Sequence, residues 1–375
     1  MKYKIPKLFR RFAFGIIIFK LTMLTNNVLA SSIVVPPFDS AVRINGRFAK
    51  EIVNGNTAVI TSFSGTAFTI AFKSHGEKED EVYILLKSPG NVFSVTVNGK
   101  QAAPLDLSAN NGEKHLIAKN LKKGVHLISV AKRTESSQGD DIFKGFQING
   151  IPQKEALPSV PKLKIEFLGN SITAGYGVLD SVKENGFSPM TEDVFSSYAG
   201  VAARELNAQM RTVAFSGRGI YRNHPDSKDG RPLPDFFPYV SVNKNIPWDF
   251  SWQPDIAVIS LGTNDFALGA PDSVKFVNSM IKFAKQVNEK YPKAKIVIID
   301  GPMQNDSYPE GVKSLTLCRK YLDTAKNELT EQGLPVFRFS LSPQDGSSGY
   351  GADWHPSKKQ SEKNGKELAE FLRKL

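Results

Sequence analysis

The chain has 375 residues, 41% of them apolar, so it can form two domains with packed cores and shows no sign of global disorder. Its net charge of +11 falls to +5 for residues 31–375, because the first 30 positions hold six Lys or Arg residues and no acidic residue. This mild, dispersed excess argues against a nucleic-acid partner. Cys318 is the only cysteine, which excludes an intrachain disulfide, and we expect it to be a small buried side chain.

The first 30 residues have the pattern of a secretory signal peptide. Five basic residues precede the apolar segments 12–19 and 21–24, and the segment ends on the small-residue motif Val28-Leu29-Ala30. Lys20 interrupts the apolar run, which argues against a membrane-spanning helix, although an uncleaved anchor is the alternative. We therefore expect cleavage before Ser31, export to the periplasm or beyond, and no stable membrane association afterwards.

Residues 31–150 are predicted to form an antiparallel β-sandwich or jelly roll. Short alternating runs end at or near turn signals such as Asn54-Gly55 and Asn98-Gly99, with little helical periodicity. The predicted strands cover 57–61, 66–72, 82–86, 92–97, 115–118 and 126–131. A polar cluster, Arg43, Asn45, Gly46 and Arg47, could form a domain interface or a solvated edge, and we favour the edge.

Residues 151–162 contain three prolines and are the best candidate for a linker, after which the periodicity changes. From 163 to 375, buried-looking strands (164–168, 211–215, 255–260, 295–300 and 335–339) are interspersed with helical patterns (195–207, 272–291, 311–332 and 356–375). Such alternation predicts an α/β domain with a parallel sheet covered by helices on both faces. Two irregular stretches, 174–193 and 217–253, interrupt it, and long irregular segments are usually functional.

Four polar clusters lie at strand ends or before the last helix, where an open α/β sheet gathers its ligands. They are Gly169-Asn170-Ser171, Ser216-Gly217-Arg218-Gly219, Leu261-Gly262-Thr263-Asn264-Asp265 and Asp353-Trp354-His355-Pro356. Each has a structural alternative, because Ser171 could cap a helix, the glycines could serve turns, and the other polar residues could precede helices. Together, however, their chemistry is complementary.

A serine hydroxyl is a poor nucleophile until a base accepts its proton, and His355 is the only histidine near such a cluster. Asp353 could orient the imidazole and stabilise its cation. The backbone N–H groups of Ser171 and Gly217 and the side-chain amide of Asn264 are suitable donors for an oxyanion. These residues predict a serine hydrolase site.

The sequence resembles the SGNH hydrolases over roughly residues 162–375. Gly169-Asn170-Ser171-Ile172-Thr173, Gly217, Gly262-Thr263-Asn264-Asp265 and His355-Pro356 are similar to that superfamily's four signature blocks, in their usual order. The resemblance implies a flavodoxin-like domain with Ser171 as nucleophile, Gly217 and Asn264 as oxyanion donors and His355 as base.

One departure points to a narrower family. The superfamily usually places its acid three residues before the histidine, where this chain has Ala352, and the spacing Asp353-x-His355 instead resembles carbohydrate esterase family 2. That family joins an N-terminal jelly roll to an SGNH domain, and some members orient the histidine through a backbone carbonyl. The segments 191–193 and 248–255, with Tyr198, are also similar to it.

The resemblance implies an O-acetyl esterase acting on acetylated polysaccharides or oligosaccharides of the xylan or glucomannan type, and the signal-peptide pattern predicts that it is exported. Trp354, Trp252 and Tyr176 are plausible sugar contacts, although Trp248 and Trp252 could equally be core residues that anchor a long loop. No metal-ligand spacing is present, so no metal or cofactor is expected. A short-chain lipase or thioesterase, and a carbohydrate-binding protein without activity, are the alternatives. The sequence does not indicate an oligomeric state.

Overall fold

Two antiparallel sheets form the N-terminal part of the computed structural model, which describes residues 1, 32–76, 80–109, 112–227, 229–241 and 243–375. The first sheet runs β10 (Lys114–Lys119), β6 (Glu81–Lys87), β12 (Asp141–Ile148), β4 (Asn56–Thr61), β3 (Ala49–Val53), with β1 (Ile33–Val35) beside β12. The second runs β13 (Gly150–Pro152), β5 (Ala67–Ser74), β11 (Gly124–Lys132), β7 (Val92–Val97), β8 (Lys100–Gln101), with β2 (Val42–Asn45) on β5 and β9 (Leu105–Asp106) on β7. The predicted signal peptide lies outside the described residues, apart from Met1.

The inward side chains of the two sheets form one core, which confirms the sandwich. Phe68 of β5 stacks on Phe143 of β12 with ring centroids 4.1 Å apart, and both rings are fully buried. All six predicted strands exist. The prediction missed β12, because Gly145 and a register shift after Phe143 interrupt its alternation of apolar and polar residues.

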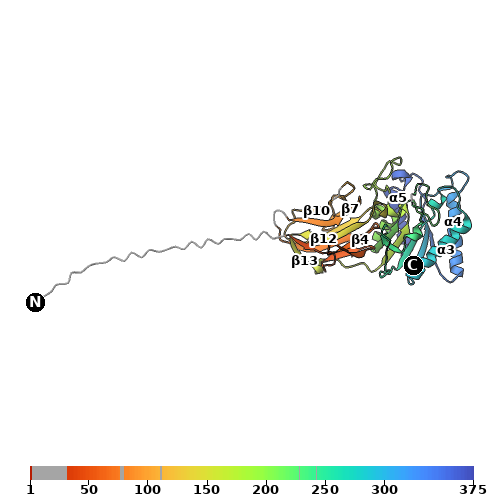
Figure 1. The fold of residues 1–375 in the computed structure, drawn as a ribbon. Helices are drawn as coiled ribbons and strands as arrows, with labels where there is room; N and C mark the ends of the chain where they lie inside the picture. Colours follow the sequence, from red (N-terminus) through yellow and green to blue (C-terminus); the bar gives the residue numbers. More distant parts are fainter. Residues whose placement is uncertain (2–31, 77–79, 110–111, 228, 242) are drawn as a thin grey trace. The chain divides into compact units, whose positions relative to one another are not determined.

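The C-terminal part contains a five-stranded parallel sheet within the described residues (Figure 1). Its spatial order is β15 (Gln209–Ala214), β14 (Lys164–Gly169), β18 (Ile256–Ser260), β19 (Lys295–Asp300) and β20 (Phe337–Ser340). Chain order 2-1-3-4-5 is the doubly wound, flavodoxin-like arrangement, which gathers ligands where the strand order reverses, beside the carboxyl end of β14.

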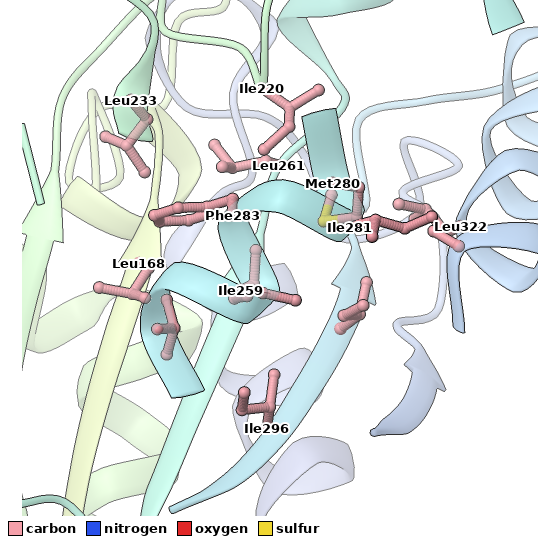
Figure 2. Close-up of a cluster of buried hydrophobic side chains, with 14 of the residues drawn as sticks. Leu168, Ile220, Leu233, Ile259, Leu261, Met280, Ile281, Phe283, Ile296 and Leu322 are labelled. Carbon is pink, nitrogen blue, oxygen red and sulfur yellow. The ribbon is translucent and has the colours of Figure 1, made fainter. Parts of the chain in front are cut away.

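Helices cover both faces of this sheet, as the alternating pattern predicted. On one face, α3 (Ser273–Lys290) and α4 (Ser314–Glu331) pack over strand residues that include Leu168, Ile259 and Ile296 (Figure 2). On the other face, α2 (Tyr198–Glu205) and α5 (Lys358–Leu372) pack over Ile165 and Phe167. Cys318 belongs to the first of these cores and is fully buried, as expected.

Arg47 corrects the expectation of a solvated edge, because the structure buries it between the sandwich and the parallel sheet. Its guanidinium makes two 2.9 Å contacts with the carboxylate of Glu166 in β14, and it donates to the carbonyl of Phe237 at 2.6 Å. Both charged side chains are fully buried. Burial of two charges is tolerated here because each is paired and hydrogen-bonded.

The expected linker, 151–162, is in fact anchored along much of its length. Its first residues belong to β13, which pairs with β5, and the carbonyl of Pro158 accepts a hydrogen bond from Arg43 at 2.6 Å. Residues 32–375 consequently form one compact unit. In the part of the chain that the structure describes, no helix is both long and apolar enough to cross a membrane.

Candidate active site

Ser171 begins the short helix α1 (Ser171–Ala174) directly after β14, and its side chain is free of capping contacts. The cap is Asn170, whose side-chain oxygen accepts from the Ile172 N–H at 3.1 Å. The turn is tight at Gly169, where a Cβ atom would lie 2.0 Å from the Thr173 hydroxyl. The alternative that Ser171 serves as the cap is therefore wrong.

His355 lies next to Ser171 in the structure, although the two residues are 184 positions apart in the sequence. Its Nε2 lies 2.8 Å from the Ser171 Oγ, and its Nδ1 lies 3.1 Å from the carbonyl oxygens of both Ala352 and Asp353. Carbonyls only accept hydrogen bonds, so Nδ1 carries the proton and Nε2 is free to accept the serine proton. The side chains thus form a serine–histidine pair oriented by backbone.

The Asp353 side chain does not orient His355, which corrects one reading of the sequence. Its carboxylate accepts a hydrogen bond from the Tyr176 hydroxyl instead. Asp353 and Trp354 both adopt left-handed backbone angles, with φ of 47° and 58°, in the one-turn helix η6 (Ala352–Trp354). This unusual turn brings two carbonyls to the imidazole, so the backbone does what an acidic side chain would otherwise do.

Tyr176 lies against the histidine, and this was not foreseen from the sequence. Its ring stacks on the imidazole of His355 with centroids 4.3 Å apart and an interplanar angle of 25°. Burial, followed by the Asp353 carboxylate, raises the pKa of the Tyr176 phenol, so the hydroxyl stays a donor. The ring and the turn together confine the imidazole.

Removal from water lowers the pKa of His355 to about 4, against opposing contributions from the two carbonyls and the Asp353 charge. The free imidazole is therefore neutral at pH 7, which is the state a general base needs. Among the described residues, its Nε2 contacts the Ser171 hydroxyl and takes part in no ion pair.

Three residues that line the same cavity, Ser171, Gly217 and Asn264, have N–H groups available for an oxyanion. Within the described residues, the backbone N–H groups of Ser171 and Gly217 donate to no acceptor. Asn264 donates one amide hydrogen to the Arg218 carbonyl at 2.9 Å, which leaves the other. Gly217 has a φ of 75°, a conformation that only glycine adopts readily.

The loop that carries Gly217 is supported by a residue whose role the sequence did not reveal. Asp265 is fully buried, and its carboxylate accepts the backbone N–H groups of Ile220, Tyr221 and Arg222 at 2.9–3.1 Å. Burial raises the pKa of Asp265 to about 6, against the lowering effect of these donors. In the sequence, only its position next to Asn264 indicated that Asp265 could belong to the site.

Ser171, His355, Gly217 and Asn264 line a cavity of about 840 Å³. Trp354 borders it with half of its surface exposed, and Tyr176 also contributes, so two of the three predicted sugar contacts reach the cavity. The sandwich contributes Glu135, Ser136 and Ser137 to its wall.

Trp252 does not reach this cavity, which corrects its predicted role. Its indole N–H donates to Gln209 at the start of β15, and its ring lies 4.3 Å from the Arg211 guanidinium. Lys164, at the start of β14, is also near the ring. Because parallel strands begin at the edge opposite their carboxyl ends, Trp252 is at the wrong edge of the sheet. Trp248 is buried beside Arg211, as the core alternative expected.

Two family models match the chain. Residues 167–362 match the GDSL-like Lipase/Acylhydrolase family, and residues 44–159 match the Carbohydrate esterase 2 N-terminal family.

Curated relatives extend this likeness. The cellulase/esterase CelE of Acetivibrio thermocellus is 36% identical over 84% of this chain, which spans 37% of that longer protein. An acetylxylan esterase / glucomannan deacetylase of Cellvibrio japonicus is 29% identical over 67% of this chain and 68% of its own length.

The fold is similar to that of a family two carbohydrate esterase from Clostridium thermocellum solved in complex with cellohexaose. The TM-score is 0.80 at 33% identity, and the likeness covers 89% of this chain and 98% of the other.

Proposed function

Because the chain belongs to the GDSL-like lipase/acylhydrolase family and, within it, to the family 2 carbohydrate esterases, we propose that it is an exported O-acetyl esterase. Its substrates would be acetylated polysaccharides of the xylan or glucomannan type, or their oligosaccharides. The observation that carries the proposal is the 2.8 Å contact between Ser171 Oγ and His355 Nε2 beside three free N–H donors.

In the first half-reaction, Ser171 Oγ attacks the acetyl carbonyl carbon while His355 Nε2 takes the hydroxyl proton. The carbonyl π electrons move to oxygen, and this oxyanion is stabilised by the Ser171 and Gly217 N–H groups and the Asn264 amide. As the tetrahedral intermediate collapses, the bond to the sugar oxygen breaks and the imidazolium returns the proton to it. The products are a free sugar hydroxyl and acetyl-Ser171.

The second half-reaction repeats these steps with water. Neutral His355 accepts a proton from water, the resulting hydroxide attacks the acetyl carbonyl, and Ser171 leaves with the proton on collapse. The imidazolium has no side-chain carboxylate partner at Nδ1, so the carbonyls of Ala352 and Asp353 stabilise it. All groups in the cycle return to their starting protonation.

Features of the cavity rim support a carbohydrate substrate. Trp354, next to the base, is half-exposed. The Lys183 Nζ lies over its ring, 4.0 Å from the ring centroid, in a cation–π contact. Aromatic faces provide an apolar surface for sugar rings, whereas the nearby polar groups suit their hydroxyls. Deacetylation of xylan and glucomannan is what the name of the Cellvibrio japonicus relative describes.

The test is acetate release by residues 31–375 from acetylated xylan, acetylated glucomannan and aryl acetate, with a long-chain aryl ester alongside. We expect release from the acetyl substrates, little turnover of the long chain, and loss of activity in Ser171→Ala with unchanged thermal unfolding. Turnover confined to long acyl chains would identify a lipase. No turnover together with saturable binding of the polysaccharides would identify a carbohydrate-binding protein.

Export has its own test, because it rests on the sequence pattern of residues 1–30. The full chain should be processed in a secreting host to a protein whose first residue is Ser31, as read by mass spectrometry. An unprocessed, membrane-attached product would identify an anchor.

A further inference from the structure

The segment that follows β11 in the sandwich reaches into the hydrolase domain beside the catalytic loops. The backbone N–H of Val194 donates to the Arg133 carbonyl at 3.2 Å, and the Arg133 guanidinium donates to the carbonyls of Met190 at 2.7 Å and Glu192 at 3.2 Å. Arg133 is 5% exposed. The backbone just before Glu135 is therefore firmly attached to the domain that carries Ser171.

The side chain of Glu135, in the sandwich, accepts a hydrogen bond from the loop that carries Gly217 in the hydrolase domain. Its Oε2 accepts the backbone N–H of Ser216 at 2.6 Å, its other oxygen accepts the Ser137 hydroxyl, and its own N–H donates to Glu192 Oε2 at 3.1 Å. The side chain is almost fully buried, with 2% of its surface exposed. Burial raises the pKa of Glu135, which shows that placing a carboxyl group here costs desolvation free energy.

Ser216 immediately precedes Gly217, whose N–H is one of the free donors next to Ser171. The loop is also held at the Gly217 carbonyl, which accepts from the His224 N–H at 2.8 Å and the Ser227 hydroxyl at 3.0 Å. At the next residue, the Arg218 carbonyl accepts from Asn264. Among these contacts, only the one from Glu135 comes from the sandwich.

We propose that Glu135 is a positioning residue of the active site, through which the sandwich holds the Ser216 amide and so aims the Gly217 N–H at the oxyanion. This inference rests on the proposed function. The sandwich then completes the catalytic machinery and is more than an appended module. Oxyanion donors act through preorganised geometry, and a displacement of about 1 Å can cost about 100-fold in rate.

The test compares Glu135→Ala, Glu135→Gln and Glu135→Asp with the wild type on aryl acetate. Glutamine can rescue, because its Oε1 can accept from Ser216 while its amide donates to the Ser137 hydroxyl. Aspartate keeps the carboxyl group but is one methylene too short to reach. We expect kcat to fall about 10- to 100-fold in the alanine and aspartate variants with KM within about twofold, and to stay near wild type in the glutamine variant.

The matched control is Lys244→Ala, which removes a partly exposed 3.4 Å ion pair to Glu51 between the same two domains, and Lys244 is not among the residues that line the cavity. It should leave kcat unchanged. Thermal unfolding of every variant identifies any loss of folding, and if the alanine variant unfolds, the aspartate and glutamine variants decide. Unchanged kcat in the alanine and aspartate variants, equal losses in all three, or an effect on KM alone would overturn the proposal.

A fluorophosphonate probe separates this inference from the proposed function, because Ser171 attacks its phosphorus through a pentacoordinate transition state, fluoride leaves, and the oxyanion donors stabilise the charge that develops on the phosphoryl oxygen. A wild type that is labelled at Ser171 but releases no acetate would refute the esterase function only. The labelling rates of the variants should then show the same order as predicted for kcat. A wild type that is neither labelled nor active would refute both.

Discussion

Replacing Asp353 by Asn tests whether backbone or side chain orients the catalytic histidine. The two carbonyls at 3.1 Å from Nδ1 are unaffected by this change, and Asn tolerates the left-handed backbone angle that this position requires. Its side-chain oxygen can still accept from Tyr176. Only the negative charge is lost, and it lies on an exposed residue, where water and salt screen it.

The expected loss in kcat is therefore small, within about threefold at pH 7, compared with about 10⁴-fold where a carboxylate holds the imidazole directly. The charge does raise the pKa of His355, so its removal should move the acid limb of kcat/KM to lower pH. The assay is aryl-acetate hydrolysis from about pH 3.5 to about pH 8, limits chosen around the acid limb. Tyr176→Phe, which keeps the stacked ring but removes the hydroxyl, is the control.

A loss of about 100-fold or more in Asp353→Asn at pH 7 would refute this reasoning, because it would mean that the carboxylate turns toward His355 during catalysis. So would an acid limb that moves to higher pH.

The remaining predictions concern the base, the oxyanion and the junction between the domains. Because burial lowers the pKa of His355 to about 4, its protonation should give an acid limb of kcat/KM near pH 4, below any step that Asp265 gives near pH 6; an imidazole that titrates near 6.5 by NMR would contradict the structure. Asn264→Ala should lower kcat by about 10²–10³-fold, while the loss of its hydrogen bond to Arg218 should cost only about 1–3 kcal/mol in unfolding, and a change in KM alone would speak against its role. Arg47→Ala strands the buried carboxylate of Glu166 and should cost about 3–5 kcal/mol in urea unfolding, whereas loss of the exposed ion pair in Lys244→Ala should cost less than about 1 kcal/mol. Equal costs would show that the junction does not depend on the buried pair.

Local patterns in the sequence were sufficient to predict the sandwich and the parallel sheet, and to place Ser171, Gly217 and Asn264 after strands of the parallel sheet and His355 before the last helix. Strand and helix periodicity depends on which residues must be buried, and this is encoded over a few neighbouring positions. Topology then brings the ends of parallel strands together, so that Ser171 and His355 meet although 184 positions separate them.

Only the tertiary structure decided which partner each polar side chain has. From the sequence, Arg47 was expected at a solvated edge, but in the structure it pairs with Glu166. Asp353 was expected to be the acid of a triad, but the backbone carbonyls of its turn contact the imidazole instead. Trp252 lies at the opposite edge of the sheet, and Glu135 reaches the oxyanion loop from another domain. Such hydrogen bonds and ion pairs join residues that are far apart in the chain, and their geometry is set by packing rather than by spacing, so no local pattern announces them.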